Sequence, residues 1–126
     1  MGAQGPLKTP IRTVIADDHA LVRAGLRSEL DQRFVIVGEA DDAPGAIDVI
    51  HARQPDLVVC DLSMPGGGGL NVVRECATVA PIVVLTVSEA ERDLLDAVAA
   101  GAAGYLLKNT PTAELCDSFA KAAAGE

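Results

Sequence analysis

Four short apolar runs, each bounded by polar or turn-forming residues, constrain the fold of this chain more than any other feature. They cover residues 13–16, 57–60, 82–85 and 104–107. Runs of this length and composition are typical of strands that are buried on both faces of a parallel sheet. Segments with the apolar spacing of helices alternate with such strands. This alternation predicts a doubly wound, parallel α/β sheet with right-handed crossovers.

The same patterns set boundaries for five strand–helix units. Residues 1–10 are punctuated by glycine and proline and are expected to form a flexible arm, which leaves residues 11–126 as one domain. Pro111 suits the first turn of the last helix. Strands are expected at residues 12–17, 34–40, 57–61, 82–87 and 104–107, and helices at 20–32, 43–53, 70–77, 89–100 and 111–124.

Composition limits both the core and the partners of this domain. Apolar residues make up 49% of the chain but aromatic residues only 2%, so the core is expected to consist of Val, Leu, Ile and Ala. The formal net charge of −8 argues against nucleic-acid binding by this segment, because phosphate contacts need clustered Lys and Arg. With no apolar run long enough for a bilayer and no recognisable signal peptide, the chain is expected to be cytoplasmic, without membrane contact.

The cysteines and histidines lack the spacing of a metal site. Cys60, Cys76 and Cys116 are odd in number and are expected to be reduced, buried and small apolar residues. His19 and His51 have no metal-site spacing to the cysteines or to each other and are interpreted as non-ligands.

Polar side chains stand at or just beyond the ends of the four apolar runs. Asp17 and Asp18 follow the first run, Asp61 the second, Thr86 the third and Lys108 the fourth. Because ligands bind at the carboxyl ends of the strands in an open parallel sheet, these side chains are expected to converge. Three close carboxylates repel one another unless a cation joins them, and an oxygen cluster of this kind suits Mg²⁺. The lysine and the threonine then indicate a site for a phosphoryl group.

Each of these residues has a plainer explanation when it is taken alone. One acid of the pair would serve as a helix N-cap, and Asp61 would be a solvated loop acid. Thr86 is favoured in strands by its branched side chain, and Lys108 would be a solvated cap. The glycine run at 66–69 allows a tight turn, but it lacks the Gly-Lys-Ser/Thr ending of a P-loop. The combination and its order are therefore what carries the signal.

In combination, these residues resemble the receiver domain of bacterial two-component response regulators. The resemblance spans about residues 11–124 and implies a flavodoxin-like sheet with strand order 2-1-3-4-5 and helices on both faces. One departure is Gly67-Gly68, which replaces a larger Met-Asp pair and bears on the rigidity of the loop, not on the chemistry. The matching residues are Asp17-Asp18, Asp61 with Met64-Pro65-Gly66, Thr86 and Lys108, and segments 15–19, 37–40 and 101–108 are similar to the NarL/FixJ class.

The resemblance implies a metal-assisted phosphorylation. Asp61 is the implied phosphoacceptor nucleophile. Mg²⁺ is expected on Asp17, Asp18, Asp61 and the backbone carbonyl of Ser63, with Asp18 in direct contact and Asp17 acting through water.

The resemblance also implies a switch. Lys108 is expected to give a point charge to a phosphate oxygen, and Thr86 a hydroxyl donor. Movement of Thr86 toward the phosphoryl group would leave room for Tyr105 to turn inward, so that the face formed by helix four, strand five and helix five repacks.

The implied function is that of a signalling switch rather than an enzyme. A sensor histidine kinase or a small phosphodonor would phosphorylate Asp61, and self-catalysed phosphotransfer and autodephosphorylation would be the only catalysis. Phosphorylation is expected to allow a homodimer and to regulate transcription through a C-terminal helix-turn-helix domain, the only expected route to DNA. Because the sequence ends after the fifth helix, it is interpreted as an isolated receiver, natural or truncated.

Two other functions compete with this interpretation. A Mg²⁺-dependent phosphotransferase or phosphatase for small molecules would also use Asp61 as nucleophile, but Ser63 stands where a general acid would be needed, and no insertion could form a cap. A flavodoxin-like binding module would need aromatic residues to stack on a flavin, and the chain has one Tyr, two Phe and no Trp.

Overall fold

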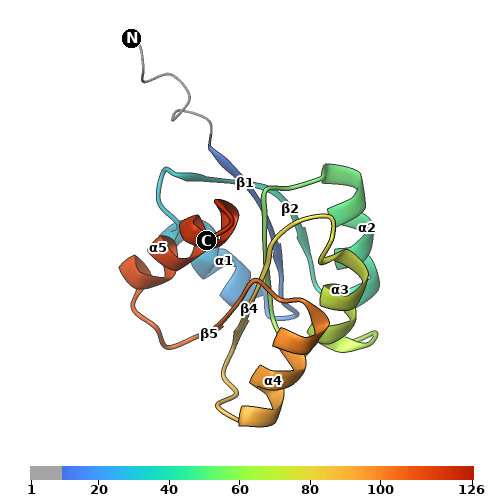
Figure 1. Ribbon diagram of the computed structural model, residues 1–126. Coiled ribbons are helices and arrows are strands. Elements are labelled where there is room, and N and C mark those ends of the chain that lie inside the picture. The colour runs from blue at the N-terminus through green and yellow to red at the C-terminus, as the bar shows by residue number, and fades with distance from the viewer. Residues whose placement is uncertain (1–9) are drawn as a thin grey trace.

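A computed structural model of the chain describes residues 10–126 and has a five-stranded parallel sheet at its centre (Figure 1). The strands are β1 (Ile11–Ala16), β2 (Phe34–Ala40), β3 (Leu57–Cys60), β4 (Ile82–Thr86) and β5 (Gly104–Leu107). The helices are α1 (Ala20–Glu29), α2 (Ala43–Arg53), α3 (Gly68–Cys76), α4 (Glu91–Ala100) and α5 (Thr112–Ala123). The strand order β2-β1-β3-β4-β5, with all pairs parallel, confirms the predicted doubly wound fold.

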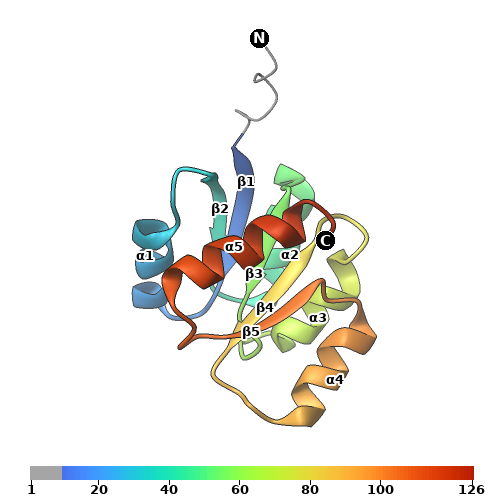
Figure 2. The same cartoon turned by 60° about the vertical axis from the view of Figure 1, so that its left-hand side comes forward.

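The helices cover the sheet in two layers. Helices α1 and α5 lie on one face, and α2, α3 and α4 lie on the other (Figures 1 and 2). Side chains alternate along the strands to serve both layers: Val14 and Val58 pack in the cluster beneath α2, α3 and α4, whereas Ile15 and Val59 pack with Phe119 of α5. Apart from Phe119, the largest fully buried side chains are Ile, Leu and Val, as the composition predicts.

The expectation that all four apolar runs are buried on both faces is wrong for the last one. The residues of β3 and β4 are buried throughout, but all four residues of β5 are only half-buried. β5 lies at the edge of the sheet and has a neighbouring strand on one side only. The order of the strands, not their composition, decides which of them takes this place.

Several helix ends differ from the predicted ones. α1 ends at Glu29 instead of residue 32, because Leu30 is already extended. α3 begins at Gly68, inside the glycine run that the sequence predicts as loop, and α4 begins two residues later than predicted. Pro111 is the N-cap of α5 and not its first helical residue, which is Thr112.

Three other expectations concern the arm, the thiols and the membrane. The flexible arm predicted for residues 1–10 lies outside the described residues except for Pro10, which is exposed and belongs to no strand. All three cysteines are buried and free, as expected. Within residues 10–126, none of the helices has the length and apolar character needed to cross a membrane.

Candidate functional site

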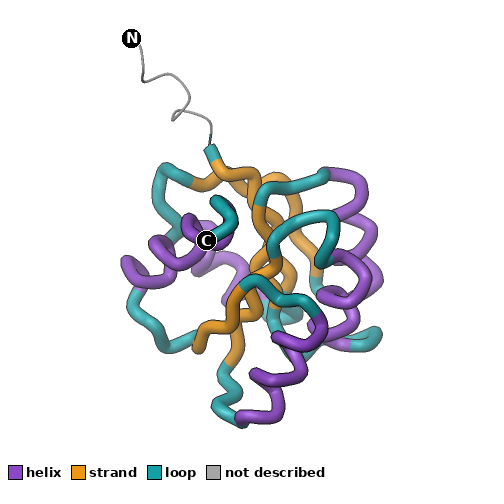
Figure 3. Tube along the Cα trace, in the orientation of Figure 1, coloured by secondary structure: helices purple, strands orange, loops and turns teal. Residues whose placement is uncertain are grey.

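The parallel register brings the ends of β1 and β3 to one edge of the sheet. Ala16 pairs with Cys60, so the next residues, Asp17 and Asp61, leave their strands side by side. The Asp61 N–H donates to the Ala16 carbonyl at 2.8 Å, which continues the ladder into the site. The loops after β1, β3 and β4 all lie at the end of the sheet opposite the N-terminus (Figure 3). The buried strands thus fix the backbone beneath both acids.

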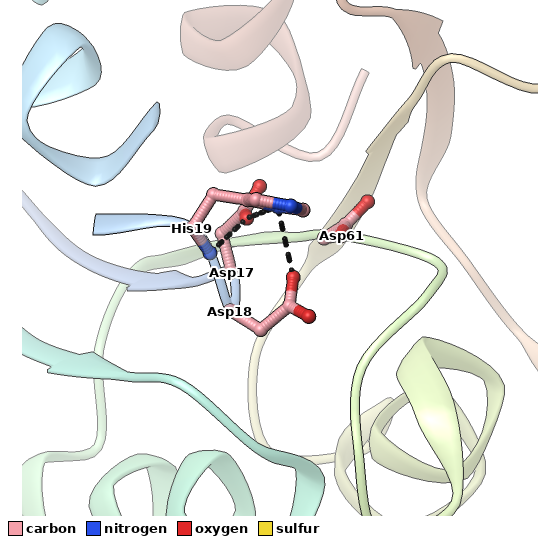
Figure 4. Close-up of side chains that lie close together, drawn as sticks. All are labelled: Asp17, Asp18, His19 and Asp61. Carbon is pink, nitrogen blue, oxygen red and sulfur yellow. Dashed lines mark hydrogen bonds and ion pairs between the residues drawn. The ribbon is translucent and has the colours of Figure 1, made fainter. Parts of the chain in front are cut away.

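Three carboxylates and one imidazole form a cluster at this edge. Asp17, Asp18, His19 and Asp61 each offer one ligand atom, and these atoms lie within 4.8 Å of one another (Figure 4). Asp17 and Asp61 are buried, whereas the Asp18 side chain is 33% exposed. The carboxylate oxygens are the hard donors that Mg²⁺ prefers, so the residues present are compatible with the predicted ion.

His19, which its spacing led us to interpret as a non-ligand, lies in this cluster. Its Nδ1 lies 3.0 Å from Asp18 Oδ1 and 3.3 Å from Asp17 Oδ1. Its spacing to the cysteines and to His51 gives no sign of this position. The signal that could have found it is its position directly after the acid pair. His51 is exposed on α2 and lies outside the cluster.

The Lys108 side chain extends from the end of β5 to the acids at the ends of β1 and β3. Its backbone N–H donates to the Thr86 carbonyl at 2.8 Å, which places it just beyond β5. Its Nζ lies 2.8 Å from Asp17 Oδ2 and 3.4 Å from Asp61 Oδ1. One ammonium therefore spans the two buried carboxylates.

The charges in the site do not balance. Burial and the negative charge of Asp17 raise the pKa of Asp61, although Lys108 and the backbone N–H of Ser63 partly offset the shift. Burial alone would lower the pKa of Lys108, but its hydrogen bond to Asp17 and the charge of Asp61 outweigh burial and raise that pKa. Lys108 is thus held as a cation, whereas burial and the charge of Asp17 disfavour the ionised form of Asp61.

The glycine run lets the start of α3 approach the backbone of Asp61. A Cβ on Gly69 would clash with the Asp61 carbonyl oxygen, so no other residue fits there without moving that backbone. The Gly69 N–H donates to the Leu62 carbonyl at 2.8 Å. Gly66 has φ of 82°, and a Cβ there would lie 2.5 Å from the Pro44 ring. The glycines therefore shape the loop after β3.

Thr86 and Tyr105 both form hydrogen bonds with Ser88, in the loop between β4 and α4. The buried Thr86 hydroxyl oxygen accepts a hydrogen bond from the Ser88 N–H at 3.1 Å. The half-buried Tyr105 donates from its hydroxyl to the Ser88 carbonyl, also at 3.1 Å. Ser88, which was not among the predicted site residues, joins Thr86 and Tyr105, the two residues predicted to form a switch. Its only signal in the sequence is that it follows Thr86 by two residues.

Hollows adjoin several of the site residues, and one of about 240 Å³ is lined by Arg23, Glu39, Ala40 and Asp41. A pocket of about 100 Å³ lies next to Lys108, well below the size of pockets that enclose small molecules. Larger hollows of about 440 and 470 Å³ occur where Val79 and Pro81 line the opposite end of the sheet.

Comparison with known proteins identifies relatives of this chain. A family model described as the response regulator receiver domain matches residues 13–120. The nitrate/nitrite response regulator protein NarP of Escherichia coli is 39% identical over 125 residues, which cover 95% of this chain and 58% of that protein. The nitrate/nitrite response regulator protein NarL of Escherichia coli is 36% identical over 122 residues, which cover 93% of this chain and 56% of that protein. The chain thus spans little more than half the length of these relatives.

Solved structures agree with the sequence relatives. The signal receiver domain of the putative response regulator NarL from Mycobacterium tuberculosis superposes with a TM-score of 0.89 at 30% identity. The match covers 93% of this chain and 98% of that one.

Proposed function

The chain belongs to the response regulator receiver domain family, of the NarL type, and on that premise we propose that Asp61 accepts a phosphoryl group and thereby switches the protein. The observation that carries the proposal is the acid cluster spanned by one lysine, at the carboxyl edge of the sheet. The donor would be a sensor histidine kinase or a small acyl phosphate. Members of this family are signalling proteins that interact with histidine kinases, rather than classical enzymes.

Asp61 is the best candidate for the nucleophile because its oxygens are the least engaged of the buried acids. Asp17 accepts from the His19 N–H with Oδ1 at 2.9 Å and from Lys108 with Oδ2 at 2.8 Å. The contact of Asp61 with Lys108 is longer, at 3.4 Å. In the proposed step an Asp61 carboxylate oxygen attacks phosphorus, the bond from phosphorus to the donor atom breaks, and the leaving group keeps the electron pair.

The other site residues would hold what the reaction needs. Asp17, Asp18, Asp61 and the Ser63 carbonyl would hold Mg²⁺, which when bound offsets the negative charge of the acids and of the phosphoryl group. The Lys108 ammonium lies close enough to Asp61 to contact an oxygen of a phosphoryl group attached there. Autodephosphorylation would follow by attack of water on the acyl phosphate.

The readout would pass through Ser88. A phosphoryl group that draws the Thr86 hydroxyl toward Asp61 would pull on the Ser88 N–H, and through its carbonyl on Tyr105. Repacking of the face formed by α4, β5 and α5 would follow. We further propose that this face controls homodimer formation and a DNA-binding output domain of helix-turn-helix type outside residues 1–126, and that transcription is the regulated process.

Intact mass after incubation with acetyl phosphate and Mg²⁺ tests the phosphoacceptor. Wild-type protein should gain one phosphate, only with Mg²⁺, and Asp61→Asn should gain none. Equal labelling of Asp61→Asn would refute the assignment. Continuous turnover of a small phosphate ester, without a stable phosphoprotein, would favour the small-molecule phosphotransferase instead.

A further inference from the structure

Arg23 holds the peptide unit that joins the two acids of the site. Its NH1 donates to the Asp17 backbone carbonyl at 2.7 Å. That carbonyl belongs to the same peptide plane as the N–H of Asp18, so the contact fixes the plane from which Asp18 departs. We propose that Arg23 is a positioning residue for the metal site, a role that rests on the proposed function and adds a residue to it.

A second contact orients the guanidinium itself. Arg23 Nε donates to Glu39 Oε1 at 3.1 Å, and Arg27 NH1 lies 2.6 and 2.7 Å from the two Glu39 oxygens. Glu39 stands near the end of β2, and both arginines stand on α1. The Arg23 side chain is only 20% exposed. The guanidinium is therefore fixed between β2 and the end of β1 before any ion or phosphodonor arrives.

Asp18 depends on this contact more than Asp17 does. The Asp17 carboxylate is buried and accepts from both the Lys108 ammonium and the His19 N–H. The partly exposed Asp18 carboxylate has, among the contacts of residues 10–126, only the His19 ring. Rotation of the peptide plane would therefore move Asp18 away from the other acids while Asp17 stayed in place. Loss of a partner that orients a metal ligand typically lowers metal affinity by about 10- to 100-fold.

Arg27 provides a matched control. It contacts the same Glu39 carboxylate, but within the described chain it makes no hydrogen bond to either acid. Arg27→Gln removes a guanidinium of the same helix and the same ion-pair network, whereas Arg23→Gln also removes the contact with the Asp17 carbonyl. Arg23→Lys keeps the charge, but its single nitrogen ends one bond shorter and cannot present the two-pronged donor set.

The experiment titrates the full chain with Mg²⁺ and follows the amide shifts of Asp18 and His19. Arg23→Gln should weaken Mg²⁺ binding about tenfold or more. Arg27→Gln should stay within about twofold of wild type, because exposed ion pairs contribute little. Arg23→Lys should fall between them. The Mg²⁺ concentration for half-maximal phosphorylation should rise in the same order, with the rate at saturating Mg²⁺ nearly unchanged.

The outcomes separate this role from a structural one and from the proposed function. If Arg23→Gln only lowers the melting temperature in EDTA and binds Mg²⁺ as wild type does, the positioning role is overturned. Equal losses in Arg23→Gln and Arg27→Gln would also overturn it, because the ion pair with Glu39 would then explain both. Should Arg23→Gln fail to fold, Arg23→Lys against Arg27→Gln gives the same decision. Wild-type protein that binds no Mg²⁺ would instead overturn the proposed function, and this role with it.

Discussion

The two halves of the site at the carboxyl edge of the sheet differ in how deeply their supporting elements are buried. In the acid half, formed by Asp17, Asp18 and Asp61, the supporting strand β3 is buried throughout, and the last four residues of β1 are buried as well. In the loop half, formed by Thr86, Ser88 and Tyr105 with α4, Thr86 ends the buried strand β4, but Tyr105 lies on β5, which is half-buried. Ala97 is the one buried residue of α4, whereas Leu95 and Val98 are 58% and 57% exposed.

This difference matches what each half would have to do. Phosphoryl transfer needs reacting atoms that are fixed before the donor arrives. In the acid half, the Asp17 carboxylate accepts from the Lys108 ammonium and the His19 N–H, and Arg23 donates to the Asp17 backbone carbonyl. A switch needs an element with a second packing arrangement of similar free energy, and such elements come from the less stable parts of a fold. In the loop half, Ser88 connects the loop before α4 to both strands, through the Thr86 hydroxyl of β4 and the Tyr105 hydroxyl of β5.

Asp17→Ala should have the largest effect, because Asp17 makes more hydrogen bonds than any other side chain of the acid half. The substitution removes a buried carboxylate that accepts hydrogen bonds from the His19 N–H and from the Lys108 cation, which should cost about 2–3 kcal/mol of unfolding free energy. Mg²⁺ binding should be lost as well. Urea unfolding in EDTA measures the first effect.

Asp18→Ala is the matched control for Asp17→Ala. The Asp18 side chain is partly exposed, so its removal should change stability in EDTA by no more than about 0.5 kcal/mol, although it too should lose Mg²⁺ binding. Equal destabilisation by the two substitutions would mean that Asp17 is not held more firmly in the fold than Asp18.

Asp61→Asn should act in the opposite direction. The pKa of Asp61 is higher in the folded than in the unfolded chain, so ionised Asp61 destabilises the fold. This cost is absent below the ordinary pKa and present in full above the raised one. The variant should therefore melt higher than wild type in EDTA. Mg²⁺ at ten times its dissociation constant should stabilise wild type by about 1.4 kcal/mol, equivalent to about 3–6 °C, and the variant by less.

Thermal melts in EDTA and in excess Mg²⁺ decide this prediction. Asp18→Asn should show a smaller gain in EDTA, since its carboxylate is closer to solvent. A wild-type protein that melts at one temperature under both conditions would show that the three carboxylates do not share an ion.

The sequence predicts the acid half well because that half follows from strand ends. In a parallel sheet, a residue just after one buried strand lies beside the residue just after the next, so Asp17 and Asp61 meet whatever the loops do. The predicted strand 34–40 and the helix 43–53 are also confirmed. Lys108 comes to the acids for the same reason, although its role toward phosphate stays a prediction.

The parts that the sequence did not predict depend on contacts between distant segments. α3 begins within glycines, which have poor helix propensity, because the backbone at Gly69 packs against the Asp61 carbonyl. The half-burial of β5 follows from its place at the sheet edge. In the sequence, Arg23 has the pattern of an ordinary polar residue of a helix. Only the fold shows that its guanidinium donates to the Asp17 carbonyl.

Thr86→Ala should separate chemistry from response in the loop half. Loss of the hydroxyl removes the acceptor for the Ser88 N–H, at a cost of about 1 kcal/mol, and leaves the acids and Lys108 intact. The variant should therefore accept phosphate as wild type does. The amide shifts of α4 and β5, compared with and without beryllofluoride, should change much less than in wild type. A variant that cannot be phosphorylated would place Thr86 in the transfer step and not in the switch.

Tyr105→Phe should have the smallest effect and is the finest test of the comparison. The substitution removes only the hydroxyl that donates to the Ser88 carbonyl and keeps the ring that packs against the core. A single neutral hydrogen bond at a half-buried site is worth about 0.5–1 kcal/mol, so global stability should barely change. Because that bond connects the loop before α4 to β5, hydrogen exchange should quicken in that loop and stay unchanged around Asp17 and Asp61. Mg²⁺ affinity should also match wild type. Faster exchange or weaker Mg²⁺ binding at the acids would mean that the two halves are coupled. The acid half would then not be fixed independently of the loop half.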